Sequence, residues 1–114
     1  MPLIKMQTAS PIDASKQDSV MKSLSDIVAK ETGKPAAYVM VTLEQTPIMM
    51  GEKNGDAAFF DVRSIGSLSP ETNASITKRL CQFCNDTLNI PAMRVYVSFT
   101  DVARSNWGWN NDTF

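Results

Sequence analysis

The chain contains the same short pattern twice, and this repeat constrains its fold more than any other feature. Residues 35–41 and residues 91–97 both read Pro-Ala-x-x-Val-x-Val, and the two copies lie 56 positions apart. In each half an amphipathic helix pattern precedes the Pro-Ala pair, and the Val-x-Val belongs to a predicted strand. The sequence therefore predicts a β-α-β unit that is written twice.

The same offset aligns the ends of the two predicted helices. Asp13 and Ser69 are both good N-cap residues, while Gly33 and Asn89 both stand where a helix ends, two residues before a proline. The apolar positions coincide as well, and the matched pairs are Val20 with Ile76, Leu24 with Leu80, Ile27 with Phe83, and Val28 with Cys84. Because caps, core faces and helix stops agree, we predict that the two halves fold alike.

These patterns predict a single domain over residues 1–114, with halves at about 2–45 and 57–101. The fold class is α+β, with a four-stranded mixed sheet and two helices on one of its faces, because each parallel crossover is right-handed. The predicted strands cover about residues 2–8, 38–44, 57–65 and 94–100, the helices run from Asp13 to Thr32 and from Ser69 to Asn89, and a turn covers 52–56 with Asn54-Gly55 as its strongest signal.

This architecture leaves the second face of the sheet without a cover. We predict Val and Leu of the second and fourth strands on the helix side, and Tyr, Met or Phe on the open side. A soluble monomer rarely exposes so large an apolar patch. We therefore expect an oligomer in which sheets pack around a shared centre, with Met40 and Tyr96 at the interface.

Composition excludes several classes of function. Eleven Lys and Arg against 12 Asp and Glu give a net charge of −1, so we expect no nucleic-acid partner. The chain has no His and two Cys, which excludes zinc sites and Ser-His or Cys-His catalysis, and we predict no cofactor and no metal. No apolar run is long enough for a membrane helix and no signal peptide is recognisable, so we expect a cytoplasmic protein without a membrane partner.

The first residues carry the strongest chemical signal. Met1 is commonly removed when the next residue is small, which would leave Pro2 with a free secondary amine. An α-amino group has an ordinary pKa of about 7.7–8.0, and an apolar pocket or a nearby cation lowers it. Such an amine is suited to taking a proton from a carbon next to a carbonyl. The alternative is that Pro2 only begins an edge strand, where its missing N–H is tolerated.

Five short motifs, in this order, resemble the macrophage migration inhibitory factor family of the tautomerase superfamily. They are Met1-Pro2, Thr32-Gly33-Lys34-Pro35, Ser64-Ile65-Gly66, Arg94-Val95-Tyr96-Val97 and residues 108–114, Gly-Trp-Asn-Asn-Asp-Thr-Phe. The resemblance covers essentially the whole chain. It implies two β-α-β halves assembled as a homotrimer with active sites between subunits, and keto–enol tautomerisation of phenylpyruvate-like or dopachrome-like compounds, which makes a small aromatic α-keto acid the expected substrate.

The resemblance also implies roles for individual residues. Pro2 is the expected catalytic base, and Lys34 is expected to bind the substrate carboxylate or the developing enolate charge. Ile65 would supply a pocket wall and a backbone N–H. The remaining expected substrate contacts are Tyr96, which would reach over from a neighbouring subunit, Ser98, where mammalian members carry an asparagine, and Trp109 in the tail.

Each of these assignments has a structural alternative. Lys34 would also suit a helix C-terminus, where its charge favours the helix dipole, and Tyr96 could pack in the core. Cys81 and Cys84 form a Cys-x-x-Cys motif, but it lies in the middle of a helix, which favours buried structural thiols over a redox pair. Two other functions stay open: a non-catalytic interaction protein that keeps this fold, and a related isomerase or decarboxylase.

Overall fold

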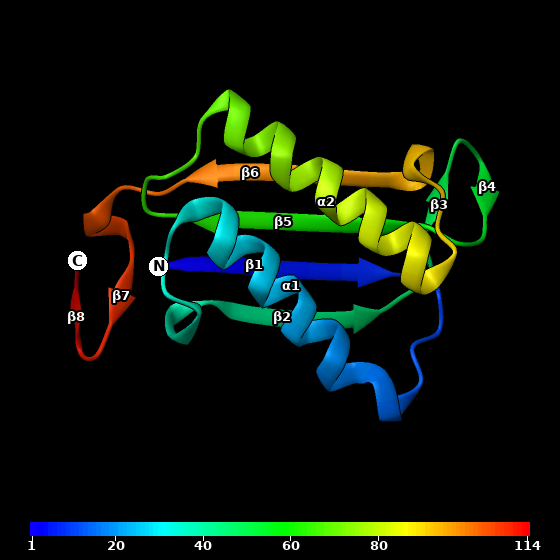
Figure 1. The fold of residues 1–114 in the computed structure, drawn as a ribbon, viewed down its shortest axis with the longest axis horizontal. Helices are drawn as coiled ribbons and strands as arrows, with labels where there is room; N and C mark the ends of the chain where they lie inside the picture. Colours follow the sequence, from blue (N-terminus) through cyan, green and yellow to red (C-terminus); the bar gives the residue numbers. More distant parts are fainter.

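The computed structural model describes residues 1–114 and consists of one sheet covered on one face by two helices (Figure 1). The sheet order is β2-β1-β5-β6, in which β1 pairs with β2 in parallel, β5 with β6 in parallel, and β1 with β5 in antiparallel orientation. The elements of this layer pair are β1 (Pro2–Thr8), α1 (Gln17–Thr32), β2 (Met40–Gln45), β5 (Ala58–Ser64), α2 (Pro70–Leu88) and β6 (Val95–Asp101). The predicted fold class is therefore confirmed.

The internal repeat is visible element by element. Strand β1 shifted by 56 positions coincides with β5, and the two 3₁₀ turns that precede the outer strands, Ala36–Tyr38 and Ala92–Arg94, are related by the same shift. Gly33 and Asn89 both end their helices in the left-handed conformation, with φ of 72° and 57°. The N-caps agree too, because the Asp13 carboxylate accepts from the Ser15 N–H and the Ser69 hydroxyl from the Thr72 N–H. The first helix departs from the prediction only at its start, where residues 14–16 form a 3₁₀ turn.

The core lies between the sheet and the two helices. It includes the inward-facing residues Ile4, Met6, Phe60 and Val62 of the central strands, together with Val20, Leu24, Val28, Ile76, Leu80 and Cys84 of the helices. Burial raises the pKa of the Cys84 thiol to about 12, and the neighbouring Cys81 contributes to this shift. Cys84 is buried within the core and Cys81 lies partly buried one turn before it on α2, which favours a structural role for the Cys-x-x-Cys motif.

Two small hairpins extend from opposite ends of the sheet (Figure 1). The first pairs β3 (Met49–Met50) with β4 (Lys53–Asn54), and its chain reversal is at Gly51 and Glu52, which have φ of 59° and 61°. The predicted turn centre at Asn54-Gly55 was therefore wrong. Two consecutive residues with positive φ fit a type I′ hairpin turn, so the reversal lies ahead of the Asn-Gly signal and Asn54 is paired in β4.

Arg94 holds this first hairpin to the end of the sheet. Its guanidinium donates to the main-chain oxygens of Asp56, Met50 and Lys53 at 2.8, 3.2 and 3.1 Å. The second hairpin, β7 (Gly108–Trp109) with β8 (Asp112–Thr113), lies at the other end, beside the N-terminus. The Gly- and Asn-rich composition of the tail allowed no element to be predicted there, and the structure shows that Asn110 and Asn111 adopt φ of 51° and 69° and close a tight turn.

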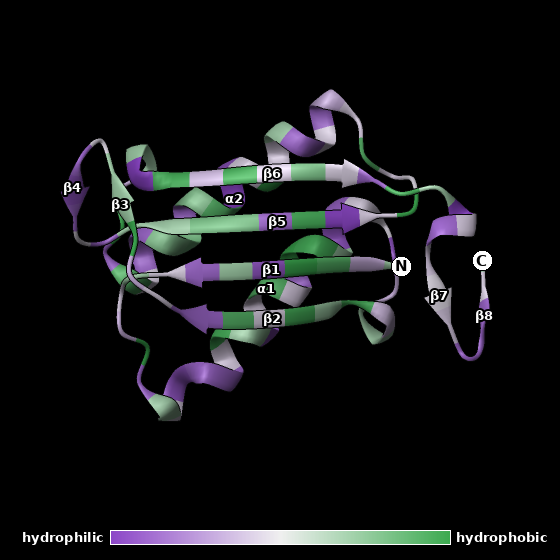
Figure 2. Ribbon diagram, turned by 180° about the vertical axis from the view of Figure 1, so that it is seen from behind, coloured by the Kyte–Doolittle hydropathy of each residue, from purple (hydrophilic) through white to green (hydrophobic).

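The open face of the sheet is more polar than predicted (Figure 2). Met40 and Tyr96 lie on this face and are each 64% exposed. Phe99, however, packs against the core, because the alternation along β6 places it with Val95 and Val97. The ladders place Lys5 opposite Asp61 and Leu3 opposite Arg63, so charged residues are interspersed with the apolar ones on this face.

Candidate functional site

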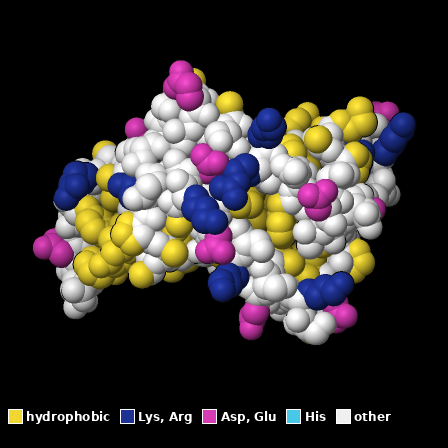
Figure 3. Space-filling view, in the orientation of Figure 1, with side chains coloured by type: hydrophobic (Ala, Val, Ile, Leu, Met, Phe, Trp, Pro, Cys, Tyr) yellow, Lys and Arg dark blue, Asp and Glu magenta, His cyan; other side chains and the backbone are white.

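Pro2 begins β1 at the end of the sheet where the C-terminal hairpin lies. Its side chain is fully buried, and it is paired with Ser64 across the antiparallel ladder. Pro2 lines a cavity of about 740 Å³. The cavity lies between the starts of β1 and β2 and the tail, and hydrophobic side chains gather at this end of the molecule (Figure 3).

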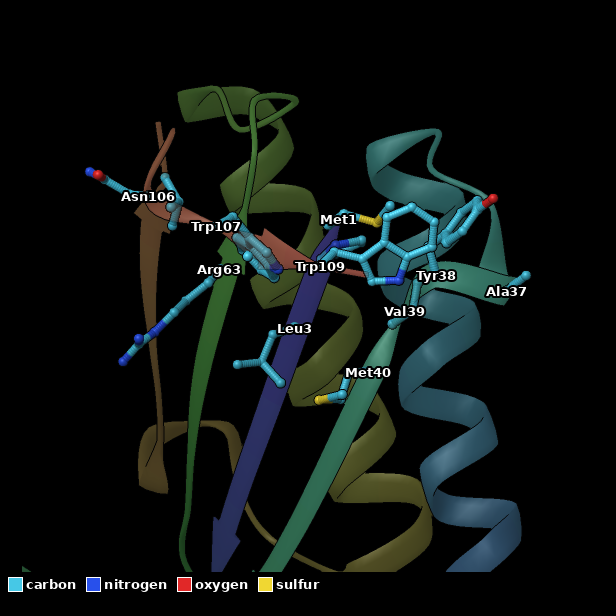
Figure 4. A pocket seen from close by; sticks show the side chains of 13 residues that line it. Met1, Leu3, Ala37, Tyr38, Val39, Met40, Arg63, Asn106, Trp107 and Trp109 are labelled. Carbon is cyan, nitrogen blue, oxygen red and sulfur yellow. The ribbon is translucent and has the colours of Figure 1, made fainter. Parts of the chain in front are cut away.

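Aromatic side chains form one wall of this cavity (Figure 4). The Trp109 ring meets the Tyr38 ring edge to face, with centroids 6.1 Å apart and an interplanar angle of 89°. The other contact of Trp109 is with Phe114, which it stacks against at 5.7 Å. Leu3, Met40 and Trp107 also belong to the apolar lining. Such a wall suits a flat or aromatic ligand, because offset and edge contacts between rings are favourable.

A second, smaller cavity of about 290 Å³ carries the positive charge of the site. Lys34 and Arg104 both line it, together with Ile65 and Phe114. Met1 and Tyr38 line both cavities, so the two spaces share a boundary at the N-terminus. An anionic group on a ligand is therefore favoured on one side of the N-terminus and an apolar body on the other.

The local backbone fixes the position of Lys34. Gly33 adopts the left-handed conformation that ends α1, and its N–H donates to the Ala29 carbonyl at 2.9 Å. The buried Thr32 hydroxyl then accepts from the Lys34 N–H at 3.3 Å. The predicted Gly-Lys-Pro motif thus works as a helix stop that turns the lysine toward the N-terminus. Neither Lys34 nor Arg104 forms a salt bridge with a side-chain carboxylate, since the two salt bridges are Arg63–Asp61 and Arg79–Glu31.

An amine at this position is easier to deprotonate than an ordinary one. Burial lowers the pKa of the Met1 α-amino group below its usual 8.0, and the positive charges of Lys34 and Arg104 lower it further. Both causes disfavour the ammonium form. The titratable side chains that line the two cavities are Lys34, Arg104, Arg63 and Tyr38, and no Asp or Glu is among them.

Ile65 lies in the loop that follows β5 and lines the smaller cavity. This loop is fastened to β6, because the Gly66 N–H donates to the Asp101 carboxylate at 2.9 Å and the Val102 N–H to the Ser64 carbonyl at 2.8 Å. Pro2, Lys34 and Ile65 therefore lie at the same end of the sheet, around the N-terminus. Trp109 joins them through the C-terminal hairpin.

Tyr96 and Ser98 lie elsewhere in the subunit. Tyr96 is paired with Phe59 and, through it, with Gln7, which is five residues or about 17 Å along β1 from Pro2. Ser98 is paired with Asp61 and, through it, with Lys5. Neither residue lines the cavities at the N-terminus of its own chain.

Sequence reasoning missed Tyr38 and Arg104. Tyr38 was assigned to a strand, but it lies in the 3₁₀ turn before β2 and faces the N-terminus. Arg104 begins the 3₁₀ turn Arg104–Asn106 that leads into the C-terminal hairpin. The one sequence signal for Arg104 is that it is the sole cation between β6 and the end of the chain.

Two further properties of the structure bear on its chemistry and surroundings. No group of three or more His, Cys, Asp or Glu side chains is placed to hold a metal ion. Neither helix is long and apolar enough to cross a membrane.

Known proteins match this chain along its full length. A sequence model of the family described as macrophage migration inhibitory factor (MIF) matches residues 1–114. The chain is 37% identical to the Xenopus laevis factor over 115 residues, covering 100% of this chain and 99% of the relative. It is 33% identical to the Mus musculus factor with the same coverage.

Solved structures agree with the sequence comparison. A homologue from Prochlorococcus marinus superposes with a TM-score of 0.92 at 34% identity, covering 98% of both chains. The factor from Toxoplasma gondii gives a TM-score of 0.93 at 32% identity, covering 98% of this chain and 99% of the other. With the repeat, the sheet order and the N-terminal site already described, these matches show that the chain belongs to the macrophage migration inhibitory factor family and has the tautomerase fold.

Proposed function

We propose that the protein is a keto–enol tautomerase that acts on phenylpyruvate-like or dopachrome-like compounds. The observation that carries this proposal is the position of the N-terminus, which lies where an apolar, aromatic-lined cavity meets a cationic one. An aromatic α-keto acid has the matching shape, with a ring at one end and a carboxylate beside the carbonyl at the other. Membership of the family supports the same activity.

In the proposed reaction, Pro2 is the base. Once Met1 has been removed, the neutral secondary amine takes a proton from the carbon next to the substrate carbonyl, and the electron pair of that C–H bond moves toward the carbonyl oxygen. The resulting enolate is stabilised by the positive charge of Lys34. Its oxygen then takes up a proton from the solvent to give the enol, and the Pro2 ammonium releases the abstracted proton to the solvent, which restores the base. The number of atoms and electrons in the substrate is unchanged, so no oxidant, reductant or cofactor is needed.

The test is phenylpyruvate tautomerisation, followed by absorbance, on protein whose N-terminus has been verified by mass spectrometry. A rate well above buffer that requires loss of Met1 supports the proposal. The absence of such a rate in fully processed protein would contradict it, and would favour a non-catalytic role in which the fold serves to bind a partner.

The catalytic amine should titrate below the ordinary α-amino range. A base acts in its deprotonated form, so kcat/KM should rise with pH and reach half its plateau below pH 8.0, the usual value for an α-amino group. Lys34→Gln removes a cation that disfavours the ammonium form, so the midpoint should move to higher pH. Lys78→Gln removes the same charge at an exposed position of α2 and should leave the midpoint unchanged. A midpoint that Lys34→Gln does not move would contradict this assignment.

We also propose that the protein is a homotrimer in which Tyr96 and Ser98 of one subunit reach the site of the next. Tyr96→Lys should then convert the trimer to a species near the 12.6 kDa of one chain, because a lysine in a buried interface carries an uncompensated charge. Asn85→Lys, which adds the same charge to the exposed surface of α2, should leave the trimer intact. Light scattering measures both, and a wild-type mass equal to one chain would contradict the trimer.

A further inference from the structure

We propose that Arg104 is a specificity-determining residue of this site, where it binds the carboxylate of the substrate while Lys34 stabilises the enolate oxygen. The inference rests on the proposed function for the identity of the reaction. The inference goes beyond the proposed function because it assigns a second cation to the site. It pairs the substrate carboxylate with Arg104 and the enolate oxygen with Lys34. The expected ligand class is an aromatic or other apolar acid.

The first observation is that the Arg104 side chain has hydrogen-bond donors without a partner in the protein. Its Nε donates to a main-chain oxygen of Phe114, the last residue of the chain, at 3.3 Å, and this is the only hydrogen bond of the Arg104 side chain. The two terminal nitrogens of the guanidinium thus have no partner within the protein. The nearby carboxylate of Asp101 accepts from the Gly66 N–H instead, and no side-chain carboxylate lines the cavity. Two guanidinium nitrogens that line a cavity without a protein partner can bind an anion there.

The second observation concerns how Arg104 is held. The 3₁₀ turn that contains it is closed by the Asn106 N–H, which donates to the Ala103 carbonyl at 2.9 Å. The Phe114 N–H donates to the Trp107 carbonyl at 3.2 Å, which fastens the end of the chain that the Arg104 Nε contacts. The guanidinium is therefore positioned from two sides. A planar group held in this way can offer its two terminal nitrogens to both oxygens of one carboxylate.

The third observation is the charge that the reaction develops. An aromatic α-keto acid carries one negative charge when it binds, and its enolate carries two. Lys34 and Arg104 come from different elements, line the same cavity and both lower the pKa of the α-amino group of Met1, the residue next to Pro2. Two cations that line the cavity at the N-terminus match two negative charges better than one cation does. The arginine fork suits the permanent carboxylate, and the compact lysine ammonium suits the single developing oxygen charge.

The neighbouring cavity indicates what the rest of the ligand looks like. The aromatic wall of Tyr38, Trp107 and Trp109 adjoins the cationic cavity through Met1 and Tyr38. A small inorganic anion would leave this wall in contact with water, whereas an acid with an apolar body would cover it. The two spaces together therefore favour amphiphilic acids.

The test is a binding titration that does not depend on turnover. The probe is 3-phenylpropionate, which has the ring and the carboxylate but no ketone, added to full-length protein that has lost Met1. The chain has two tryptophans, Trp107 and Trp109, and both line the cavity, so their fluorescence reports binding. The matched neutral probe is 3-phenylpropionamide. The variants are Arg104→Gln, Arg104→Lys and the control Lys78→Gln, which removes a charge from an exposed position of α2.

We expect Arg104→Gln to weaken 3-phenylpropionate binding about tenfold or more and to leave the amide unaffected, because a hydrogen bond to a charged group contributes more than one to a neutral group. Arg104→Lys should recover part of the affinity, and Lys78→Gln should match the wild type. Wild-type affinity in Arg104→Gln would overturn the proposal. Equal loss of acid and amide would overturn it as well, since it would mean that Arg104 only supports the tail. Full affinity for 3-phenylpropionate in Arg104→Lys would contradict the proposal that the two terminal guanidinium nitrogens bind both carboxylate oxygens.

The two proposals fail in different ways. If protein without Met1 binds 3-phenylpropionate in an Arg104-dependent way but turns over no phenylpyruvate, the anion-binding role of Arg104 is supported and the tautomerase proposal is contradicted. If the protein turns over phenylpyruvate with a KM that Arg104→Gln does not change, the tautomerase proposal is supported and the anion-binding role of Arg104 is contradicted.

Discussion

Protein that retains Met1 is expected to show no tautomerisation of phenylpyruvate above the buffer rate. With Met1 in place the Pro2 nitrogen is a tertiary amide, and an amide nitrogen has no basic lone pair. General base catalysis contributes a factor of about 10²–10⁴, and that factor should be lost. The Met1 side chain also lines both cavities, so its retention should weaken substrate binding in addition.

The comparison needs two preparations that differ only at the first residue. Mass spectrometry assigns the N-terminus of each preparation. Both should be folded, because Met1 is not part of the core, and circular dichroism verifies this. Processed Pro2→Ala is a useful second variant. It keeps an amine but loses the ring that is buried at the start of β1, so its rate should be strongly reduced. A full rate in protein that retains Met1 would exclude Pro2 as the base.

Phe60→Ala is expected to lower the free energy of unfolding by about 3–5 kcal/mol, which is the usual cost of removing a buried phenylalanine ring. Phe60 is fully buried in the middle of β5, where it is paired with Met6 of β1 and Val97 of β6. Both helices cover this face of the sheet, so the surrounding structure can only partly collapse into the cavity. Because a domain of this kind has a total stability of about 5–15 kcal/mol, the variant should be close to unfolding.

Phe83→Ala is the matched control for this prediction. It removes the same ring from a position of α2 that is only partly buried, so the loss of stability should be clearly smaller. Urea unfolding followed by circular dichroism measures both, at one fixed protein concentration, since the stability of an oligomer depends on concentration. Equal losses in the two variants would mean that the core is not centred on the middle of β5.

Much of the fold follows from the sequence because its signals are local and occur twice. The helix stops at Gly33 and Asn89 and the caps at Asp13 and Ser69 depend on residues within a few positions of each other. Each of these signals occurs again 56 positions later, so the second half of the chain supports the prediction made from the first. The turn of the first hairpin escaped prediction because Gly51 and Glu52 are set by how β3 and β4 pair, which no single residue encodes. The tail escaped for the same reason.

The candidate site divides in the same way. Pro2 was predicted from its place after Met1, and the family resemblance added Lys34 and Ile65; the structure places all three among the residues that line the two cavities at the N-terminus. The sequence by itself determined that Lys34 follows a helix stop, but not that the lysine faces the N-terminus. Only the tertiary structure decided that Tyr38 and Arg104 join the site, since they come from separate turns that the sheet brings to one end. The tertiary structure also decided that Tyr96 lies at the other end of its own sheet, because distance along a strand is fixed by the ladder register and not by sequence motifs.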